Sequence, residues 1–287
     1  MFQELPNLGV GLGYRHNLHE QIIDSKKDIE FLEVITDQFI YAPTERQDLF
    51  FDAMNSFRLV PHSVGMSVGT DTPLDDDYIR RTAEFVERAQ APWTSDHLSM
   101  TKVPEVDLGQ LAPIWFTKEL VKVVCRNVAN IRASIGVPFL LENITYYFPI
   151  PMNQMTEAEF ITEIVEKSGC GILLDLNNVY LNSMNLRYDP YRFLESIPLE
   201  RVVQIHIAGY EQSGDLLVDT HGAKACESVW ELLKFILNKS PINGISIEWD
   251  QHFPEFEIIL DELAIARSIL GRRKHAHVES RNAASIG

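Results

Sequence analysis

The sequence is poor in cysteine. Its 287 residues include only Cys125, Cys170 and Cys226, and none of them has a second cysteine at CxxC spacing. An odd and scattered set argues against a disulfide framework and fits a reducing cytoplasm. We therefore expect a cytoplasmic protein whose thiols are small residues of the core.

Long apolar runs and basic surfaces are lacking as well. No stretch of eighteen consecutive apolar residues occurs, so no membrane span is expected. The start, MFQELPNLGV, lacks the basic residues and apolar core of a signal peptide. The net charge is −16, from 25 basic and 41 acidic residues. Because nucleic acids bind Lys- and Arg-rich faces, we expect no nucleic acid partner, whereas cations or a basic partner are compatible with this charge.

The sequence does contain a regular alternation of short apolar runs and longer helical patterns. The strand-like runs are 8–15, 30–35, 58–69, 93–100, 138–144, 171–180, 202–209 and 244–250. The helix-like stretches are 16–28, 43–56, 75–89, 114–135, 156–168, 189–196, 226–239 and 255–270. Eight such units predict an α/β fold, a closed parallel (β/α)8 TIM barrel.

An open, doubly wound sheet is the rival architecture. It would carry a glycine-rich phosphate loop, but Gly9, Gly11 and Gly13 in GVGLGY do not have GxGxxG spacing. No linker or charge block splits the chain, so we expect one barrel domain over residues 1–271. The polar stretch 272–287, RRKHAHVESRNAASIG, is expected to be a disordered tail.

Polar residues stand where most of the strand-like runs end. They are His62, Asp96, His97, Glu142, Asn143, Asp175, Asn177, Asn178, His206, Asp219, His221, Glu248 and Asp250. Because the carboxyl ends of barrel strands converge on one mouth, we expect these side chains to meet there. Crowded carboxylates resist joint ionisation unless cations compensate them, and Arg15 is the main basic residue near these strand ends. Two or three bound metal ions would compensate the charge.

The chemical types of these side chains restrict the metal. Nitrogen and oxygen ligands without a thiolate suit zinc, manganese or iron. Structural roles remain open as alternatives: Asp96 and Asp250 would cap helices, and Asn143 and Asn177 would satisfy loop backbone.

Several motifs resemble one known family. GVGLGYR, LENITYYF, GCGILLDLNNVYLN, QIHIAGY, VDTHG and SIEWD occur in order between residues 8 and 270. They are similar to the multinuclear non-heme iron-dependent oxidative enzymes, long catalogued as a domain of unknown function. The resemblance implies a xylose-isomerase-like TIM barrel, related to a zinc endonuclease family with three metals in the barrel mouth.

The resemblance also implies nine ligands divided among three ions. They are His62 and His97 at one outer ion, Glu142 as a bridge, Asp175, His206 and Glu248 at the central ion, and Asn178, Asp219 and His221 at the third. Asn178 stands where the endonuclease pattern has a histidine, which predicts a looser third site. The segments PHSVGMSVG and SDHLSM differ from the family's commonest sequence, but both keep their histidine, His62 and His97.

Three further residues are candidate catalytic residues. Arg15 would orient a substrate carboxylate bidentately, or alternatively pair with Glu33. Asp96 and Asn143 would support the ligand imidazoles by hydrogen bonds, a role also expected of Asn177 and Asp250.

The resemblance implies a specific chemistry. Iron, as Fe(II) or Fe(III), and dioxygen as cosubstrate would oxidise a cysteine of a ribosomally synthesised precursor peptide, leading to β-carbon excision, a thioamide or a heterocycle. A small partner protein would bind the leader of the peptide. The segments 101–116 and 145–157 are expected to be loops at the mouth whose exposed aromatic residues form an interface or groove; these are Trp115, Phe116, Tyr146, Tyr147 and Phe148.

Other functions remain as alternatives. A zinc-dependent, endonuclease-like phosphodiesterase would use nearly the same ligands, but the net charge of −16 counts against it. A metal-dependent sugar isomerase on the same barrel would leave Asn178, Asp219 and His221 without a role.

Overall fold

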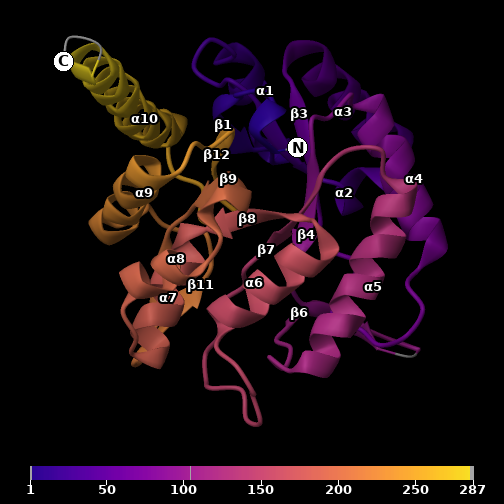
Figure 1. The fold of residues 1–287 in the computed structure, drawn as a ribbon. Coiled ribbons are helices and arrows are strands. Elements are labelled where there is room, and N and C mark those ends of the chain that lie inside the picture. The colour runs from indigo at the N-terminus through magenta and orange to yellow at the C-terminus, as the bar shows by residue number, and fades with distance from the viewer. Residues whose placement is uncertain (1, 104, 285–287) are drawn as a thin grey trace.

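The strands form a closed parallel barrel. The structure, a computed structural model, describes residues 2–103 and 105–284. In the order around the barrel the strands are β1 (Gly9–Gly13), β12 (Gly244–Ile247), β9 (Val202–Ile207), β8 (Gly171–Asp175), β7 (Phe139–Glu142), β4 (Thr94–His97), β3 (Leu59–Ser63) and β2 (Leu32–Ile35). Each lies within a predicted strand-like run, so the predicted TIM barrel is confirmed. Figure 1 shows the strands at the centre with helices around them.

Helices cover the outside of the barrel. They are α1 (His19–Asp24), α2 (Asp37–Ile40), α3 (Thr44–Ser56), α4 (Asp76–Arg88), α5 (Lys118–Ser134), α6 (Glu157–Ser168), α7 (Leu176–Leu186), α8 (Pro190–Ser196), α9 (Glu227–Lys239) and α10 (Phe256–Ala284). Three short 3-10 turns are η1 (Phe2–Glu4), η2 (His16–Leu18) and η3 (Leu199–Arg201). The backbone of α10 continues beyond Gly271, and residues 285–287 lie outside the described residues. The predicted single domain with a disordered tail stays a prediction.

Local sequence signals explain where several helices begin and end. Thr156 and Glu159 form a capping box at the start of α6, because each side chain accepts a hydrogen bond from the other residue's backbone N–H, at 3.2 and 2.8 Å. Gly169 ends the helix with φ of 70°, a conformation that glycine adopts without strain. Asp75 caps α4 by accepting from Tyr78 N at 3.0 Å.

Two parts of the chain differ from expectation. The predicted strand 171–180 ends at Asp175, and α7 begins at Leu176, because the Asp175 carboxylate accepts from Asn178 N at 2.7 Å and so starts a helix. The predicted loop 101–116 contains most of an antiparallel hairpin, β5 (Met100–Val103) with β6 (Val106–Ala112). A second hairpin pairs β10 (Tyr210–Ser213) with β11 (Leu216–Asp219). Both hairpins follow barrel strands on the mouth side.

The apolar core has two parts. The main cluster lies between the barrel and its helices. A smaller cluster, which includes Phe31, Trp93 and Leu173, joins side chains from strands on different sides of the barrel and so fills the interior. Gly11 allows this packing, because a Cβ there would lie 2.5 Å from the ring and the carbonyl oxygen of Phe31.

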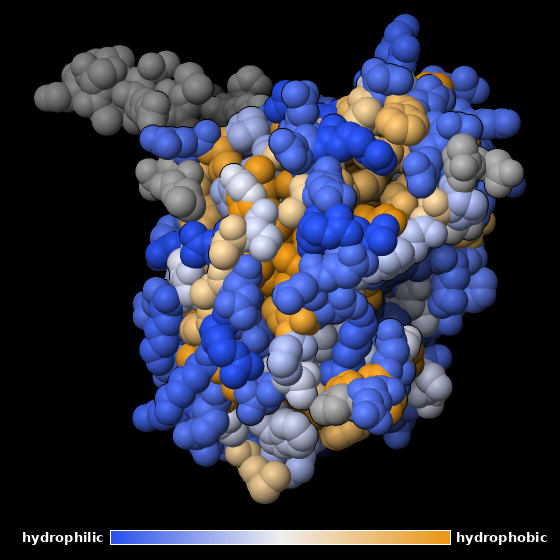
Figure 2. Space-filling model, turned by 90° about the vertical axis from the view of Figure 1, so that its right-hand side faces the viewer, coloured by the Kyte–Doolittle hydropathy of each residue, from blue (hydrophilic) through white to orange (hydrophobic). Residues whose placement is uncertain are grey.

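One side of the outer surface is mainly polar. Figure 2 shows the side that lies on the right in Figure 1; hydrophilic side chains cover most of it, with apolar ones visible between them. On α4, Arg80 and Arg81 both pair with Asp77, Arg81 at 2.7 Å. Across residues 2–103 and 105–284, no helix combines the length and the apolar composition needed to cross a membrane.

Candidate metal centre

A cavity of about 500 Å³ lies in the mouth of the barrel. Seven of the nine predicted ligands line it: His62, His97, Glu142, Asn178, Asp219, His221 and Glu248. The other two, Asp175 and His206, are fully buried beside them. The strand ends therefore bring the predicted ligands to one place.

The first group consists of His62, His97 and Glu142, from the neighbouring strands β3, β4 and β7. The Glu142 Oε2 atom lies 3.3 Å from His62 Nε2 and 3.4 Å from His97 Nε2. The two Nε2 atoms are 3.4 Å apart. Two imidazole nitrogens and one carboxylate oxygen thus face one point, as the ligands of a metal ion do.

The second group consists of Glu142, Asp175, His206 and Glu248, and each offers an atom within 4.8 Å of the others. His206 Nδ1 lies 2.9 Å from Glu248 Oε2 and 3.2 Å from Glu142 Oε1. Glu142 therefore turns one oxygen to each group, which is the geometry of a bridging carboxylate.

The third set is less compact. His221 Nε2 lies 2.8 Å from Asp219 Oδ1. Asn178 lines the same cavity, but its side chain is already engaged: Thr145 donates to its Oδ1, and its Nδ2 donates to the Asn143 carbonyl at 3.0 Å. Among the histidine, cysteine and acidic side chains of the described residues, clusters of three or more form at the first two positions and not at this one.

Other side chains hold the imidazole rings. Ser95 Oγ lies 2.8 Å from His62 Nδ1, and Asp250 Oδ2 lies 3.0 Å from His221 Nδ1. On the far side of the His206 ring, the Glu33 carboxylate lies 2.8 Å from Nε2. The sequence prediction included Asp250 in this role and missed Ser95 and Glu33. Ser95 stands beside His62 in the strand register, so correct pairing of β3 with β4 would have indicated it.

The other predicted supporting residues, Asp96, Asn143 and Asn177, form hydrogen bonds with groups other than the imidazole nitrogens. Asp96 accepts from the backbone N–H of Met66 at 2.9 Å and of His97 at 2.6 Å, and it lies 3.8 Å from the His97 ring, which is too far for a hydrogen bond. Asn143 bonds both backbone groups of Asp175, at 3.0 and 2.9 Å.

Asn177 donates to the Asp219 carboxylate at 3.0 Å. The expected hydrogen bonds from Asn143 and Asn177 to ligand imidazoles do not form among the described residues, because backbone and carboxylate groups take both amides.

Arg15 pairs with Asp250 and not with Glu33. Its Nε donates to Asp250 Oδ1 at 2.7 Å, and its NH2 group lies 4.0 Å from Glu248. The alternative of an Arg15–Glu33 pair is wrong, because Glu33 faces the interior of the barrel and is engaged by His206.

Electrostatic shifts reveal an acid-rich cluster that attracts positive charge. Burial alone lowers the pKa of His97, but Glu142 and Asp96 outweigh it and raise that pKa to about 9. Burial by itself raises the pKa of Glu248, but the positive charges of His206 and His221 outweigh burial and lower that pKa to about 2. Burial and the nearby Glu142 raise the pKa of Asp175 well above its ordinary value. Burial and the nearby His97 lower the pKa of His62, whereas the carboxylates draw positive charge onto His97, His206 and His221, which a bound cation would supply instead.

Several buried polar atoms of the cluster have no hydrogen-bond partner. They include Glu142 Oε2 and Asp175 Oδ2. Leaving a buried polar atom unpaired costs about 1–3 kcal/mol, so such atoms together indicate a missing ligand. Metal ions with imidazole and carboxylate ligands fit these atoms.

The predicted aromatic surface is only partly exposed. Trp115, Tyr147 and Phe148 are exposed, with 43%, 38% and 58% of their surface accessible. Phe116 and Tyr146 are buried, and their rings meet edge to face with centroids 5.6 Å apart. The expected exposure of these two residues is wrong, because Phe116 packs on Phe160 of α6.

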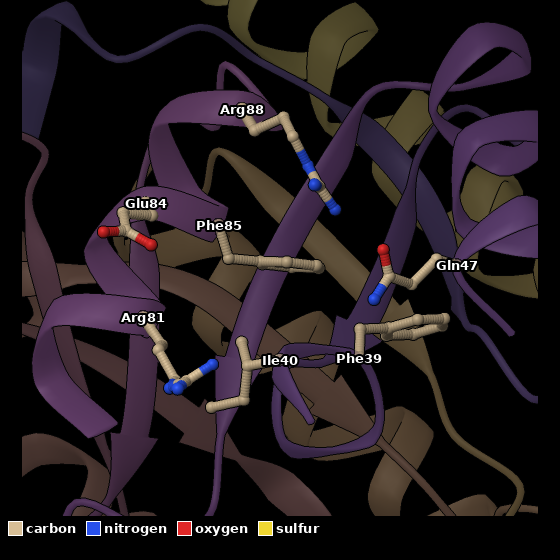
Figure 3. A pocket seen from close by; sticks show the side chains of 7 residues that line it. All are labelled: Phe39, Ile40, Gln47, Arg81, Glu84, Phe85 and Arg88. Atoms are coloured by element: carbon tan, nitrogen blue, oxygen red, sulfur yellow. The ribbon is translucent and has the colours of Figure 1, made fainter. Parts of the chain in front are cut away.

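A smaller cavity of about 160 Å³ lies outside the barrel, where α4 meets α2 and α3 (Figure 3). Its charged side chains are engaged: Arg81 with Asp77 and Glu84 with Arg80, while Arg88 lies over the Phe50 ring. Figure 3 shows apolar side chains between the arginines and neither an imidazole nor a thiol. This cavity therefore offers no ligand set, and the candidate chemistry belongs to the mouth.

The chain is similar to known proteins over most of its length. A family model described as "RiPP precursor modification enzyme MbnB/TglH/ChrH" matches residues 9–271. A UPF0276 protein of Caulobacter vibrioides is 34% identical over 268 residues, covering 92% of this chain and 96% of its own. A UPF0276 protein of Haemophilus influenzae is 32% identical over 300 residues, covering 94% and 97%.

Solved structures share the fold at low sequence identity. Endonuclease IV from Thermus thermophilus has a TM-score of 0.58 at 14% identity, covering 93% of this chain and 100% of its own. A D-psicose 3-epimerase has a TM-score of 0.55 at 14% identity, covering 93% and 98%.

Proposed function

The chain belongs to the family described as "RiPP precursor modification enzyme MbnB/TglH/ChrH". From this membership we propose that the protein oxidises a cysteine residue of a ribosomally synthesised precursor peptide, with iron as the metal and dioxygen as the oxidant. The observation that carries the proposal is the position of Glu142, which faces two groups of ligand atoms at once. A pair of adjacent metal ions suits the joint binding of a substrate group and an oxidant.

The residues that would hold the ions follow from the geometry. His62, His97 and Glu142 would bind one ion, and Glu142 with Asp175, His206 and Glu248 would bind the second. Asp219 and His221, with Asn178 nearby, would bind a third. Iron held there would supply affinity for a thiolate and the ability to pass electrons to dioxygen.

The protein's own residues would bind and orient the peptide. The cavity of about 500 Å³ has room for a cysteine and part of its neighbours. Ile35, Val64 and Leu111 line it with apolar surface that excludes water. The oxidation would begin with loss of a hydrogen from the cysteine Cβ, with dioxygen as the electron acceptor.

The three candidate catalytic residues would act as positioning residues. Arg15 fixes Asp250, which in turn holds the His221 ring. Asp96 fixes the backbone of His97, and Asn143 fixes that of Asp175. Arg15 Nε and NH2 are taken by Asp250 and NH1 donates to the Tyr14 carbonyl at 2.8 Å, so the geometry favours support of the site over capture of a substrate carboxylate.

We also propose a partner and a location. A small protein that binds the leader peptide would dock near the mouth, against the exposed side chains of Trp115, Tyr147 and Phe148. Cytoplasmic location is the corresponding proposal, since free thiols and reduced iron persist in a reducing compartment. Full peptide turnover by the chain alone would argue against an obligatory partner.

The deciding experiment tests the chemistry. Iron-loaded protein, partner and candidate peptide are incubated with and without dioxygen, and the peptide is analysed by mass spectrometry. An oxygen-dependent mass change confined to a cysteine is expected. Since endonuclease IV shares the fold at a TM-score of 0.58, the same preparation is tested on abasic DNA. DNA cleavage with an unchanged peptide would favour the zinc phosphodiesterase instead, and epimerisation of a ketose would favour the sugar enzyme.

Metal analysis provides an independent test. We expect two or three irons per chain after anaerobic purification from iron-replete cells, because the predicted ligands converge on one cavity. Less than one metal per chain would contradict the proposal. Zinc as the only metal that restores activity would favour the hydrolase.

A further inference from the structure

His206 lies between the candidate metal centre and a carboxylate that no metal group includes. Its Nδ1 faces Glu142 and Glu248, at 3.2 and 2.9 Å. Its Nε2, on the opposite side of the ring, lies 2.8 Å from the carboxylate of Glu33. Glu33 comes from β2, and only 1% of its surface is accessible. Such a buried carboxylate is costly unless its contacts compensate it.

A chain of hydrogen bonds fixes the orientation of Glu33. Trp93 Nε1, which can only donate, binds Gln204 Oε1 at 2.6 Å. This contact turns the Gln204 amide nitrogen toward Glu33, to which it donates. Trp93 and Gln204 are both fully buried. Glu33 Oε2 therefore accepts from Gln204 and lies 2.9 Å from His206 Nε2, and Glu33 Oε1 lies 2.8 Å from the same ring nitrogen.

We propose that Glu33 is the positioning residue of His206: it accepts the Nε2–H hydrogen bond and so leaves Nδ1 free, with its lone pair toward Glu142 and Glu248, to bind a metal ion. A neutral imidazole carries one proton, so an acceptor at one nitrogen directs the other to the metal. This inference rests on the metal site of the proposed function, but not on iron, dioxygen or a peptide substrate.

Glu33→Gln tests the inference at constant shape. A glutamine has one acceptor oxygen, whereas Gln204 and His206 both donate at this position. If the glutamine oxygen takes the Oε2 position and accepts from Gln204, the amide nitrogen takes the Oε1 position, 2.8 Å from His206 Nε2, where its N–H groups repel a proton on Nε2 and favour one on Nδ1, which blocks the metal. If the glutamine oxygen takes the Oε1 position, the amide nitrogen at the Oε2 position meets the donating amide nitrogen of Gln204. Either arrangement disturbs the protonation of the His206 ring or breaks the hydrogen bond that Gln204 donates.

The measurement is Co²⁺ binding to the full-length apoprotein, followed by ligand-field absorption and by competition with a chelator at fixed pH. We expect Glu33→Gln to weaken the ion bound by His206 about 10- to 100-fold and to change its absorption bands. Glu262→Gln is the matched control. Glu262 is also buried and accepts from Trp249 Nε1 and Ala225 N, both at 2.8 Å, and neither bond involves a candidate ligand. Its Co²⁺ affinity and spectrum should equal those of the parent.

Parent-like affinity and spectrum in Glu33→Gln would overturn the inference, and so would an equal loss in Glu262→Gln. A second measurement needs no variant: ¹⁵N-histidine-labelled parent protein is loaded with Zn²⁺, and the ring of His206 is observed by NMR. A proton on Nε2 and a metal-shifted Nδ1 are expected; a proton on Nδ1 would overturn the inference even if Glu33→Gln did not fold. Failure of peptide oxidation would leave both measurements unaffected, so the two proposals fail separately.

Discussion

Glu142 connects the two groups of candidate metal ligands, because it belongs to both of them. Its Oε2 faces His62 and His97, and its Oε1 faces His206. Removing its charge should therefore disturb two positions, whereas removing an outer imidazole should disturb one.

We expect Glu142→Gln to lose about two ions per chain and His97→Ala about one, since a bridging carboxylate serves both ions. Elemental analysis of anaerobically purified variants measures this. Circular dichroism confirms that each variant is folded. Equal metal content in Glu142→Gln and the parent would exclude the bridging role.

Asn178 is the weakest of the predicted ligands, and the structure provides a control for it. Asn182 lies one turn further along α7 and bonds the same loop, accepting from Tyr146 N at 2.6 Å and donating to the Ile144 carbonyl at 2.9 Å. Unlike Asn178, it does not line the cavity. Both substitutions to alanine remove two buried hydrogen bonds, so each should cost about 1–3 kcal/mol of unfolding free energy.

Only Asn178→Ala should also lower metal content at the third position. Metal analysis together with urea unfolding separates the two effects. A full metal complement in Asn178→Ala would remove Asn178 from the ligand set.

At the scale of elements, the hairpin β5–β6 forms part of the cavity wall through Gln110 and Leu111. Ser67 anchors its first strand: the Ser67 hydroxyl oxygen accepts from Thr101 N at 2.9 Å and from Lys102 N at 3.0 Å. We expect Ser67→Ala to loosen the hairpin by about 1–2 kcal/mol, because two backbone donors lose their partner.

Hydrogen exchange of the segment 100–112 measures this loosening, which should appear as roughly tenfold faster exchange or more. Ser240→Ala, which removes a hydrogen bond to the Leu199 carbonyl at 2.8 Å, should leave that segment unchanged. Unchanged exchange in Ser67→Ala would show that strand pairing alone holds the hairpin.

Helix α6 carries a pH-dependent group outside the site. Burial raises the pKa of Glu157 from 4.5 to about 8. Between these values the unfolded chain releases the proton and the folded chain keeps it. The stabilisation of the folded state by the protonated Glu157 side chain is therefore complete below pH 4.5, and it is lost as the pH rises through about 8.

Glu157→Gln removes this dependence. Relative to the parent, its stability should fall less between pH 5 and 8, by at most about 1.4 kcal/mol per pH unit and by less where solvent reaches the carboxylate. Thermal melts of both proteins across this range measure the difference. Parallel stability curves would contradict the raised pKa.

At the scale of the whole molecule, metal binding should stabilise the barrel, because the ligands come from six strands or the loops beyond them. A ligand at 100 times its dissociation constant adds about 2.7 kcal/mol, which for a domain of this size raises Tm by roughly 5 °C or more. Calorimetry with Fe²⁺ under anaerobic conditions, then with a chelator, should show the rise and its loss. Glu142→Gln should not respond; an equal response would place the stabilising ion elsewhere.

The sequence by itself determined the architecture and the ligand types. Alternating apolar and helical stretches determine eight β–α units, and the barrel then forces strand ends such as His62 and Glu248 toward one mouth. The start of α7 was missed because LLDLNNVY was assigned to one strand despite its polar residues Asp175, Asn177 and Asn178; the cap made by Asp175 became visible only in the structure. The hairpins were missed because the residues of β6 and β10 are all exposed or half-buried, so neither strand carries a buried apolar pattern.

Only the tertiary structure decided which side chains support the ligands. Glu33 and His206 stand on strands that are not neighbours in the barrel, and they meet across its interior. That contact depends on the stagger of the strands and on which faces turn inward at each level, which periodicity along one strand does not specify. The same reason explains why Arg15 pairs with Asp250 and why Phe116 is buried: a sequence specifies the chemistry of each strand end, whereas the closure of the barrel sets the partner that each side chain meets.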